Sequence, residues 1–148
     1  MKTPKRISIL ARLFFLLFLA GTLLAERPVI SENAELASYA QDLYRQNGTD
    51  MARSAFDLQE KDYWGRVFVI QIVSRSTTLS DDLLQAFLIG GAVSQHARSA
   101  LDQIVVVAEV EFSNRKTMVL RADGACCEKL YNNRMTVDAF TEDCLRME

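Results

Sequence analysis

The chain after Pro28 begins with hydrophobic residues at the spacing of a helix. Four of them share one helical face: Leu36, Ala40, Leu43 and Tyr44. Ser31 is a suitable N-cap for this helix. Asn47-Gly48 ends it, because both residues tolerate the left-handed conformation that follows a helix.

The next segment predicts a second short helix and then the first strand. Thr49 is a suitable cap, Gly65 closes the segment, and one apolar face is made by Met51, Ala55 and Leu58. The hydrophobic period changes at Arg66. Residues 67–73 form an almost unbroken β-branched and aromatic run, which predicts a strand covered on both faces.

A long helix is predicted over residues 81–100, with Ser80 as its N-cap. Its inward face is expected to carry Leu84, Phe87, Leu88 and Gly91. Gly90-Gly91 inside this helix costs about 1 kcal/mol per residue relative to alanine. We therefore expect a neighbouring helix or strand to pack closely here, with a hinge or a ligand contact as the alternative.

Two further strands, 104–112 and 117–122, are predicted on either side of a three-residue hairpin loop, 114–116. The first of them begins as a continuous apolar run, Ile104-Val-Val-Val107, and then alternates, which predicts a strand that starts buried and ends with one solvent-exposed face. The expected cross-strand pairs are Phe112 with Met118, Val110 with Leu120, and Glu109 with Arg121.

The C-terminal residues predict two short helices, 125–131 and 136–147, which would form a helical hairpin. Asn132-Asn133 ends the first helix, and Thr136 caps the second, whose apolar face carries Val137, Phe140 and Cys144. The whole pattern predicts an α+β fold. Its small, three-stranded, mostly antiparallel sheet (strand-helix-strand-strand) would pack with an N-terminal helical pair and the C-terminal helical hairpin. Residues 26–148 are expected to form a single α+β domain.

Residues 1–25 have the layout of a secretory signal peptide. A basic head that ends at Arg6 precedes an uncharged run from Leu13 to Ala25, after which cleavage is expected. The alternative is an uncleaved membrane anchor over residues 7–25, about 28 Å long as a helix. Either leader predicts an extracytoplasmic domain, periplasmic or secreted, with membrane contact only through residues 7–25 if they are retained.

The charge distribution narrows the class of partner. Four of the 17 basic side chains and none of the 19 acidic ones lie in residues 1–25, so the rest of the chain has a net charge of about -6. No run of lysine or arginine follows Arg6, which argues against a nucleic-acid partner. We expect the partner to be another envelope or secreted protein.

The three cysteines, Cys126, Cys127 and Cys144, lie in the C-terminal quarter of the chain. In an oxidising compartment, Cys144 is expected to form a disulfide with Cys126 or Cys127, which would stabilise the fold by about 3 kcal/mol. The third thiol would be buried and inert, link two chains, or be reactive. Redox catalysis is disfavoured, because adjacent cysteines lack the two-residue spacer of thiol-redox motifs. Soft-metal binding by three thiolates is chemically feasible but less favoured than a structural disulfide.

Candidates for other catalysis are few. His96 is the only histidine, no Gly-x-Ser-x-Gly motif occurs, and we interpret His96 as a solvent-facing residue near a helix end. The closest acidic pairs, Asp81 with Asp82 and Asp57 with Glu60, are explained as helix caps or exposed residues. The sequence favours a non-enzymatic protein without deciding the question, and no cofactor or metal site is expected.

Tyr63 and Trp64 form the one aromatic cluster, at the predicted entry to the first strand. Packing at the core or edge is the first interpretation, and a partner surface is the second. Asn47-Gly-Thr49 also matches a glycan acceptor, whose use depends on the host.

Our functional hypothesis is a small exported, non-enzymatic binding, adaptor or assembly-accessory protein of the cell envelope or extracellular space. Its surface would be the N-terminal helical third with Tyr63 and Trp64, or the outward edge of the third predicted strand. The alternative is a thiol-dependent redox or soft-metal-binding protein that uses Cys126, Cys127 and Cys144.

Overall fold

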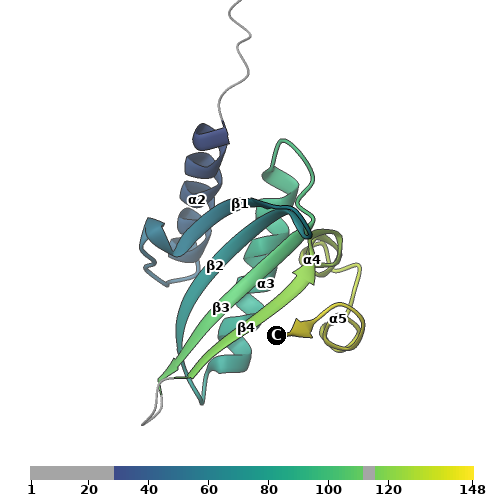
Figure 1. Cartoon of the computed structure of the whole chain (residues 1–148). Coiled ribbons are helices and arrows are strands. Elements are labelled where there is room, and N and C mark those ends of the chain that lie inside the picture. Colours follow the sequence, from purple (N-terminus) through teal and green to yellow (C-terminus); the bar gives the residue numbers. More distant parts are fainter. Residues whose placement is uncertain (1–28, 112–115) are drawn as a thin grey trace, which may run out of the picture.

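The computed structural model describes residues 29–111 and 116–148 (Figure 1). The described part is α+β, with four α-helices and a five-stranded mixed sheet. Its elements are α2 (Val29–Gln46), a 3-10 turn (Arg53–Ala55), β1 (Phe56–Lys61), β2 (Gly65–Arg75), α3 (Leu79–His96), β3 (Gln103–Glu111), β4 (Lys116–Asp123), α4 (Gly124–Tyr131), α5 (Val137–Asp143) and β5 (Arg146–Met147). The predicted leader, residues 1–25, lies outside the described residues.

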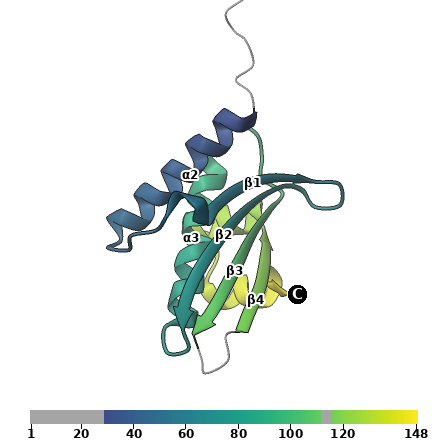
Figure 2. The ribbon, with the colours of Figure 1, turned by 60° about the vertical axis from the view of Figure 1, so that its left-hand side comes forward.

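The strands follow each other across the sheet in chain order, β1-β2-β3-β4-β5. Neighbours are antiparallel except β2 and β3, which are parallel and joined by the crossover helix α3. Helices α2, α3 and α4 lie on one side of the sheet, as the two views in Figures 1 and 2 show. Within the two described segments, no helix has the length and apolar composition needed to cross a bilayer.

The core lies between the sheet and these helices. Alternate residues of the three central strands point into it, and each is at most 6% exposed: Phe68, Ile70, Ile72, Ile104, Val106, Ala108, Leu120 and Ala122. The predicted face of the first helix is confirmed in part, because Leu36, Ala40 and Tyr44 are buried. The prediction that the strand over 67–73 is covered on both faces holds only near its start, since Val67 is buried and Val73 is 64% exposed.

The predicted N-terminal helical pair and three-stranded sheet are wrong. Residues 56–61, expected to end a second helix, form β1, which pairs with β2 through a hairpin. Phe56 and Leu58 are buried while Asp57 and Gln59 are less so, which is the two-residue period of a strand. A short apolar segment can satisfy both helical and strand spacing. Gly65, at φ +67°, begins β2 and closes no helix.

The predicted register between the last two long strands is also wrong. Met118 pairs with Ala108, Leu120 with Val106, and Arg121 with Val105. Each observed partner is four residues earlier in β3 than predicted, because residues 111–115 separate the last pair, Val110 and Lys116. An even shift leaves every side chain on its own face of the sheet, so the inward positions are correct although their partners are not. Phe112 lies outside the described residues.

The C-terminal prediction fails as a helical hairpin. The two helices exist, and the hydroxyl of Thr136 accepts a hydrogen bond from the Ala139 amide as an N-cap. The second helix, however, ends at Asp143, not at residue 147. Residues 146–147 then form β5 along β4, and the Glu148 amide donates to the Val119 carbonyl.

The long helix is observed as Leu79–His96, and its glycine pair allows two close approaches. A Cβ atom on Gly90 would lie 2.6 Å from Cγ2 of Ile104 in β3. A Cβ atom on Gly91 would overlap the backbone carbonyl of Cys127 in α4. The expected close packing is therefore confirmed, against both the sheet and a neighbouring helix.

Replacing Gly91 by alanine should lower the free energy of unfolding by about 1–3 kcal/mol, because α4 must move away from α3. The higher helix propensity of alanine, about 1 kcal/mol, offsets only part of this cost. Urea unfolding measures the change. The control is Gln95→Ala on an exposed turn of the same helix, which should change stability by less than about 0.5 kcal/mol. A Gly91→Ala protein as stable as wild type would contradict the close contact.

Candidate functional site

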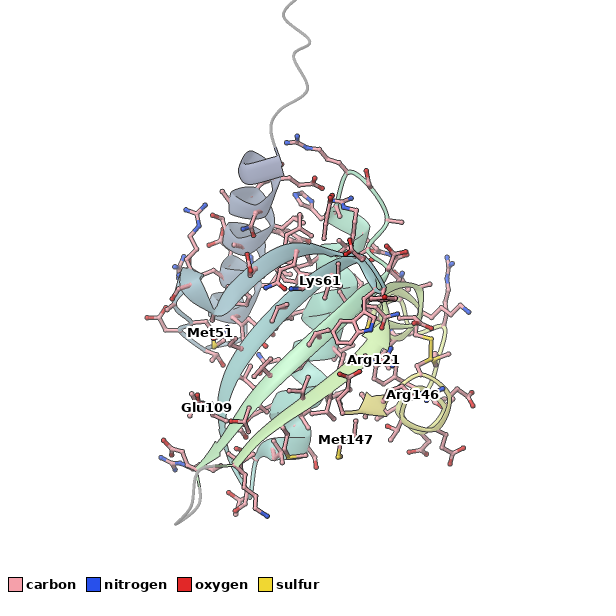
Figure 3. All side chains as sticks on the ribbon, viewed as in Figure 1. Met51, Lys61, Glu109, Arg121, Arg146 and Met147 are labelled. Carbon is pink, nitrogen blue, oxygen red and sulfur yellow. A yellow bond between two sulfur atoms is a disulfide. The ribbon has the colours of Figure 1, made fainter. Side chains whose placement is uncertain are left out.

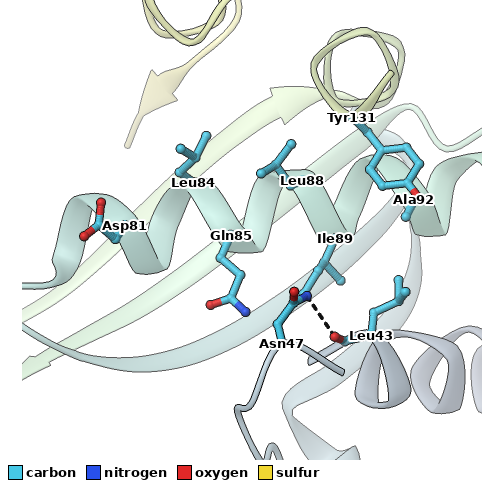
Figure 4. A pocket seen from close by; sticks show the side chains of 9 residues that line it. All are labelled: Leu43, Asn47, Asp81, Leu84, Gln85, Leu88, Ile89, Ala92 and Tyr131. Atoms are coloured by element: carbon cyan, nitrogen blue, oxygen red, sulfur yellow. Dashed lines mark hydrogen bonds between the residues drawn. The ribbon is translucent and has the colours of Figure 1, made fainter. Parts of the chain in front are cut away.

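An apolar groove follows the outward side of α3, between α2 and the C-terminal helices (Figure 4). We call it the α3 groove and define it by Leu43, Leu84, Leu88, Ile89, Tyr131 and Val137. It consists of two adjoining hollows of about 580 and 490 Å³. Leu84 and Leu88 line both hollows, so the two form one continuous surface.

The groove exists because α3 has more apolar surface than its neighbours cover. Phe87 is buried among the core residues, and Gly91 is covered by α4. Leu84 and Leu88, four residues apart on the same face, are only half-buried, so half of the predicted inward face is open. Figure 4 shows both leucines pointing to the side on which Tyr131 lies.

The rim of the groove is polar at one end. Asp81, Gln85 and Asn47 line the first hollow. The Asn47 side chain donates a hydrogen bond of 2.9 Å to the Leu43 carbonyl, and Gly48 follows at φ +81°, so the predicted helix end is confirmed. Asn47 is exposed, and its glycosylation stays a prediction. Arg134 lines the second hollow, which places a cation beside an apolar surface.

The three cysteines lie close to this surface but are used differently. Cys126 of α4 and Cys144 at the end of α5 form a disulfide, with their Cα atoms 6.2 Å apart. Cys127 is a free thiol with no exposed surface. Burial, and secondly the carboxylate of Asp123, raise the pKa of the Cys127 thiol far above its ordinary value. The thiolate needed for redox chemistry or soft-metal binding is therefore strongly disfavoured at Cys127.

The acidic and histidine candidates have structural contacts. His96 is exposed at the end of α3 as predicted, and its ring stacks on Tyr39 with centroids 4.2 Å apart. Asp82 accepts hydrogen bonds from the hydroxyls of Ser74 and Thr78, which fastens the start of α3 to β2. Among the residues that the structure describes, no group of three His, Cys, Asp or Glu side chains could hold a metal ion.

The acidic pair Asp57 and Glu60 lies on β1 and not on the predicted helix. Asp57 accepts hydrogen bonds from the side-chain amides of Asn33 and Gln59. Asn33 also accepts a hydrogen bond from the Leu58 amide through its Oδ1 atom, at 2.9 Å. A side chain of α2 thus pairs with one backbone amide on the outer edge of β1.

Tyr63 and Trp64 lie in the turn between β1 and β2. Tyr63 is 98% exposed, whereas Trp64 is 36% exposed and its ring lies 5.5 Å from the Arg121 guanidinium of β4. The two neighbours therefore have different environments: Trp64 packs at the sheet, and Tyr63 faces solvent. The outward edge of β4, predicted as a partner surface, is occupied in part by β5.

Sequence reasoning missed the α3 groove. Leu84, Leu88 and Gly91 share one helical face, because Gly91 is seven residues from Leu84, so spacing alone carried no signal for a groove along this face. What the sequence could not provide was the position of α4, which covers Gly91 but leaves the leucines open.

Comparison with known proteins returned no family model that matches this chain, and no significant match to a curated protein or a solved structure.

The Cys127 thiol should be unreactive toward a thiol reagent in the native protein and react once per chain after unfolding. Because the folded pKa lies above the ordinary 9.0, the folded chain keeps a proton that the unfolded chain releases at high pH. The stability that the protonated Cys127 thiol contributes is complete below about pH 9. Above that pH the free energy of unfolding falls by about 1.4 kcal/mol per pH unit.

The measurement is urea unfolding at pH 8 and at several higher values, for wild type and for Cys127→Ala. The Cys127→Ala variant should lack the decrease in the free energy of unfolding that this thiol causes in wild type at high pH. Equal pH dependence of the two proteins, or rapid labelling of the native thiol, would show that Cys127 is not held in a buried neutral state.

Proposed function

We propose that this chain is an exported, non-enzymatic binding protein of the cell envelope or extracellular space, which acts as an adaptor or assembly accessory. The observation that carries the proposal is the α3 groove, with Leu84 and Leu88 open on a helix that is otherwise well packed. Burying the remaining exposed surface of these two half-buried leucines, with that of Tyr131 and Val137, would contribute up to a few kcal/mol of binding free energy.

The occupant that fits the groove is an amphipathic helix of a partner protein. The two hollows lie on either side of the Leu84–Leu88 row: the first reaches Leu43 of α2, and the second reaches residues 133–137 after α4. A partner helix lying over the two leucines would place apolar side chains, spaced by three and four residues, into both hollows. Tyr131 and Val137 on the rim are 41% and 46% exposed and would pack against the sides of such a helix. Because residues 26–148 carry a net charge of about -6, basic residues on the solvent side of that helix would favour association.

Two observations support the extracytoplasmic setting. One is the basic head and apolar run of residues 1–25. The other is the Cys126–Cys144 disulfide, since such bonds persist mainly in oxidising compartments. Intact-mass measurement of the protein recovered outside the cytoplasm tests the export route, because cleavage after Ala25 and retention of the leader give different masses.

Photocrosslinking from Tyr131 tests the groove. Benzoylphenylalanine at Tyr131 should crosslink to a partner peptide that has apolar residues every three or four positions, identified by mass spectrometry. The control is the same crosslinker at Tyr63, an exposed aromatic residue far from the groove. Leu88→Asp in the Tyr131-labelled protein should reduce the crosslinked product at least about tenfold, by placing a charge in the apolar floor. Crosslinking at Tyr63 alone, or products unaffected by Leu88→Asp, would exclude the groove as the binding site.

A further inference from the structure

A second surface lies on the opposite side of the molecule from the α3 groove. It is the sheet face without helices in the described chain, which we call the open sheet face (Figure 3). Its apolar residues are Val69, Val73, Val105, Val107 and Val119; Val73 is 64% exposed, Val105 is 5% exposed, and the other three are half-buried. Cα pairing places Val69 beside Val105 and Val107 beside Val119, so the valines form one continuous patch.

Opposite charges flank this patch along the strand direction. Glu109 of β3 is exposed and pairs with Thr117, on one side of Val107. Arg121 of β4 pairs with Val105, on the other side. Figure 3 shows Glu109 and Arg121 toward opposite ends of the sheet. Glu109 and the partner of Arg121, Val105, are four residues apart on β3, about 13 Å. Each end also carries the opposite charge, since Arg75 pairs with Glu111 and Asp123 pairs with Gln103.

The Arg121 side chain has hydrogen-bonding capacity left for a partner. Its Nε atom donates to the Glu148 carboxylate at 2.6 Å, and the guanidinium lies over the Trp64 ring. A guanidinium carries five N–H donors, so the donors of its two terminal nitrogens are not used by this bond to Glu148. Trp64 is 36% exposed, and its ring lies under this cation.

We propose that two copies of this chain associate through their open sheet faces, about a two-fold axis that lies between the sheets, crosses the strands and passes at the level of Val107. This axis exchanges the levels of Glu109 and Val105 on β3. Because Arg121 is the neighbour of Val105, Glu109 of each copy comes next to Arg121 of the other. Two sheets pack about 10 Å apart, which a glutamate and an arginine side chain can span together.

The same axis makes the valine patch its own complement. Val107 and Val119 lie at the axis and face their counterparts, and Trp64 covers the rim on the side of Glu109 of the other copy. Glu111 comes to the level of the second copy's Asp123, which is a like-charge contact at the rim. The projected face, four strands wide, is about 500 Å². Stable complexes bury about 800 Å² on each partner, so we expect association in the micromolar range.

Charge reversal across the two-fold axis tests the arrangement by sedimentation equilibrium of the full chain, at tens to hundreds of micromolar. Wild type should dimerise. Glu109→Arg alone, and Arg121→Glu alone, should each weaken association at least about tenfold, because both symmetric pairs then join like charges. An equimolar mixture of the two variants should form a mixed dimer, because each pair then joins opposite charges.

The control is Glu142→Arg, the same charge change at an exposed position of α5, which should leave dimerisation unchanged. Glu109→Arg also guards against a folding defect, since the Glu109 side chain is exposed and circular dichroism can verify the fold. A wild-type protein that stays monomeric throughout this range would overturn the proposal. So would variants that dimerise like wild type, as they would if the apolar leader drove association, or a mixture that fails to recover it. The α3 groove is on the other side of the molecule, so the crosslinking experiment and the sedimentation experiment test different surfaces and can fail independently.

Discussion

The contact of α3 with two partners at once is the constraint on which the rest of the structure depends. Gly90 brings the helix against Ile104 of β3, and Gly91 brings it against the α4 backbone. The first contact holds the crossover between the parallel strands β2 and β3 close to the sheet, and the second fixes where α4 lies. The position of α4 in turn leaves Leu84 and Leu88 only half-buried. The α3 groove is thus a consequence of how closely α3 is packed elsewhere.

Sequence patterns predicted the elements whose period was long and unambiguous. The first helix, the long helix with its glycine pair, and the strands around residues 70, 107 and 120 were all found from spacing alone. The segment 56–61 was misassigned because Phe56 and Leu58 fit both a helical face and an alternating strand, and only pairing with β2 decides between them. The two residues of β5 carry almost no periodic signal, and their position depends on β4 beside them.

The candidate sites show the same division between local and long-range information. That the three cysteines lie near one another in sequence was visible, but the choice of Cys126 over Cys127 depends on which side of α4 faces α5 and which faces α3. Trp64 was recognised as an unusual aromatic residue, yet its environment comes from Arg121, two strands away across the sheet. Side chains that meet across strands cannot be identified until the register is known.

Both edges of the sheet are covered in part by the chain itself. On one margin, the amide of Leu58 already donates to Asn33 of α2. On the other, β5 lies along β4, and Glu148 both bonds to the Val119 backbone and holds Arg121. Partial cover of both edges leaves less unsatisfied backbone for an incoming strand, which disfavours the open-ended lateral growth that leads to fibres. The association proposed above differs from such growth in kind, because a two-fold axis closes it at a pair.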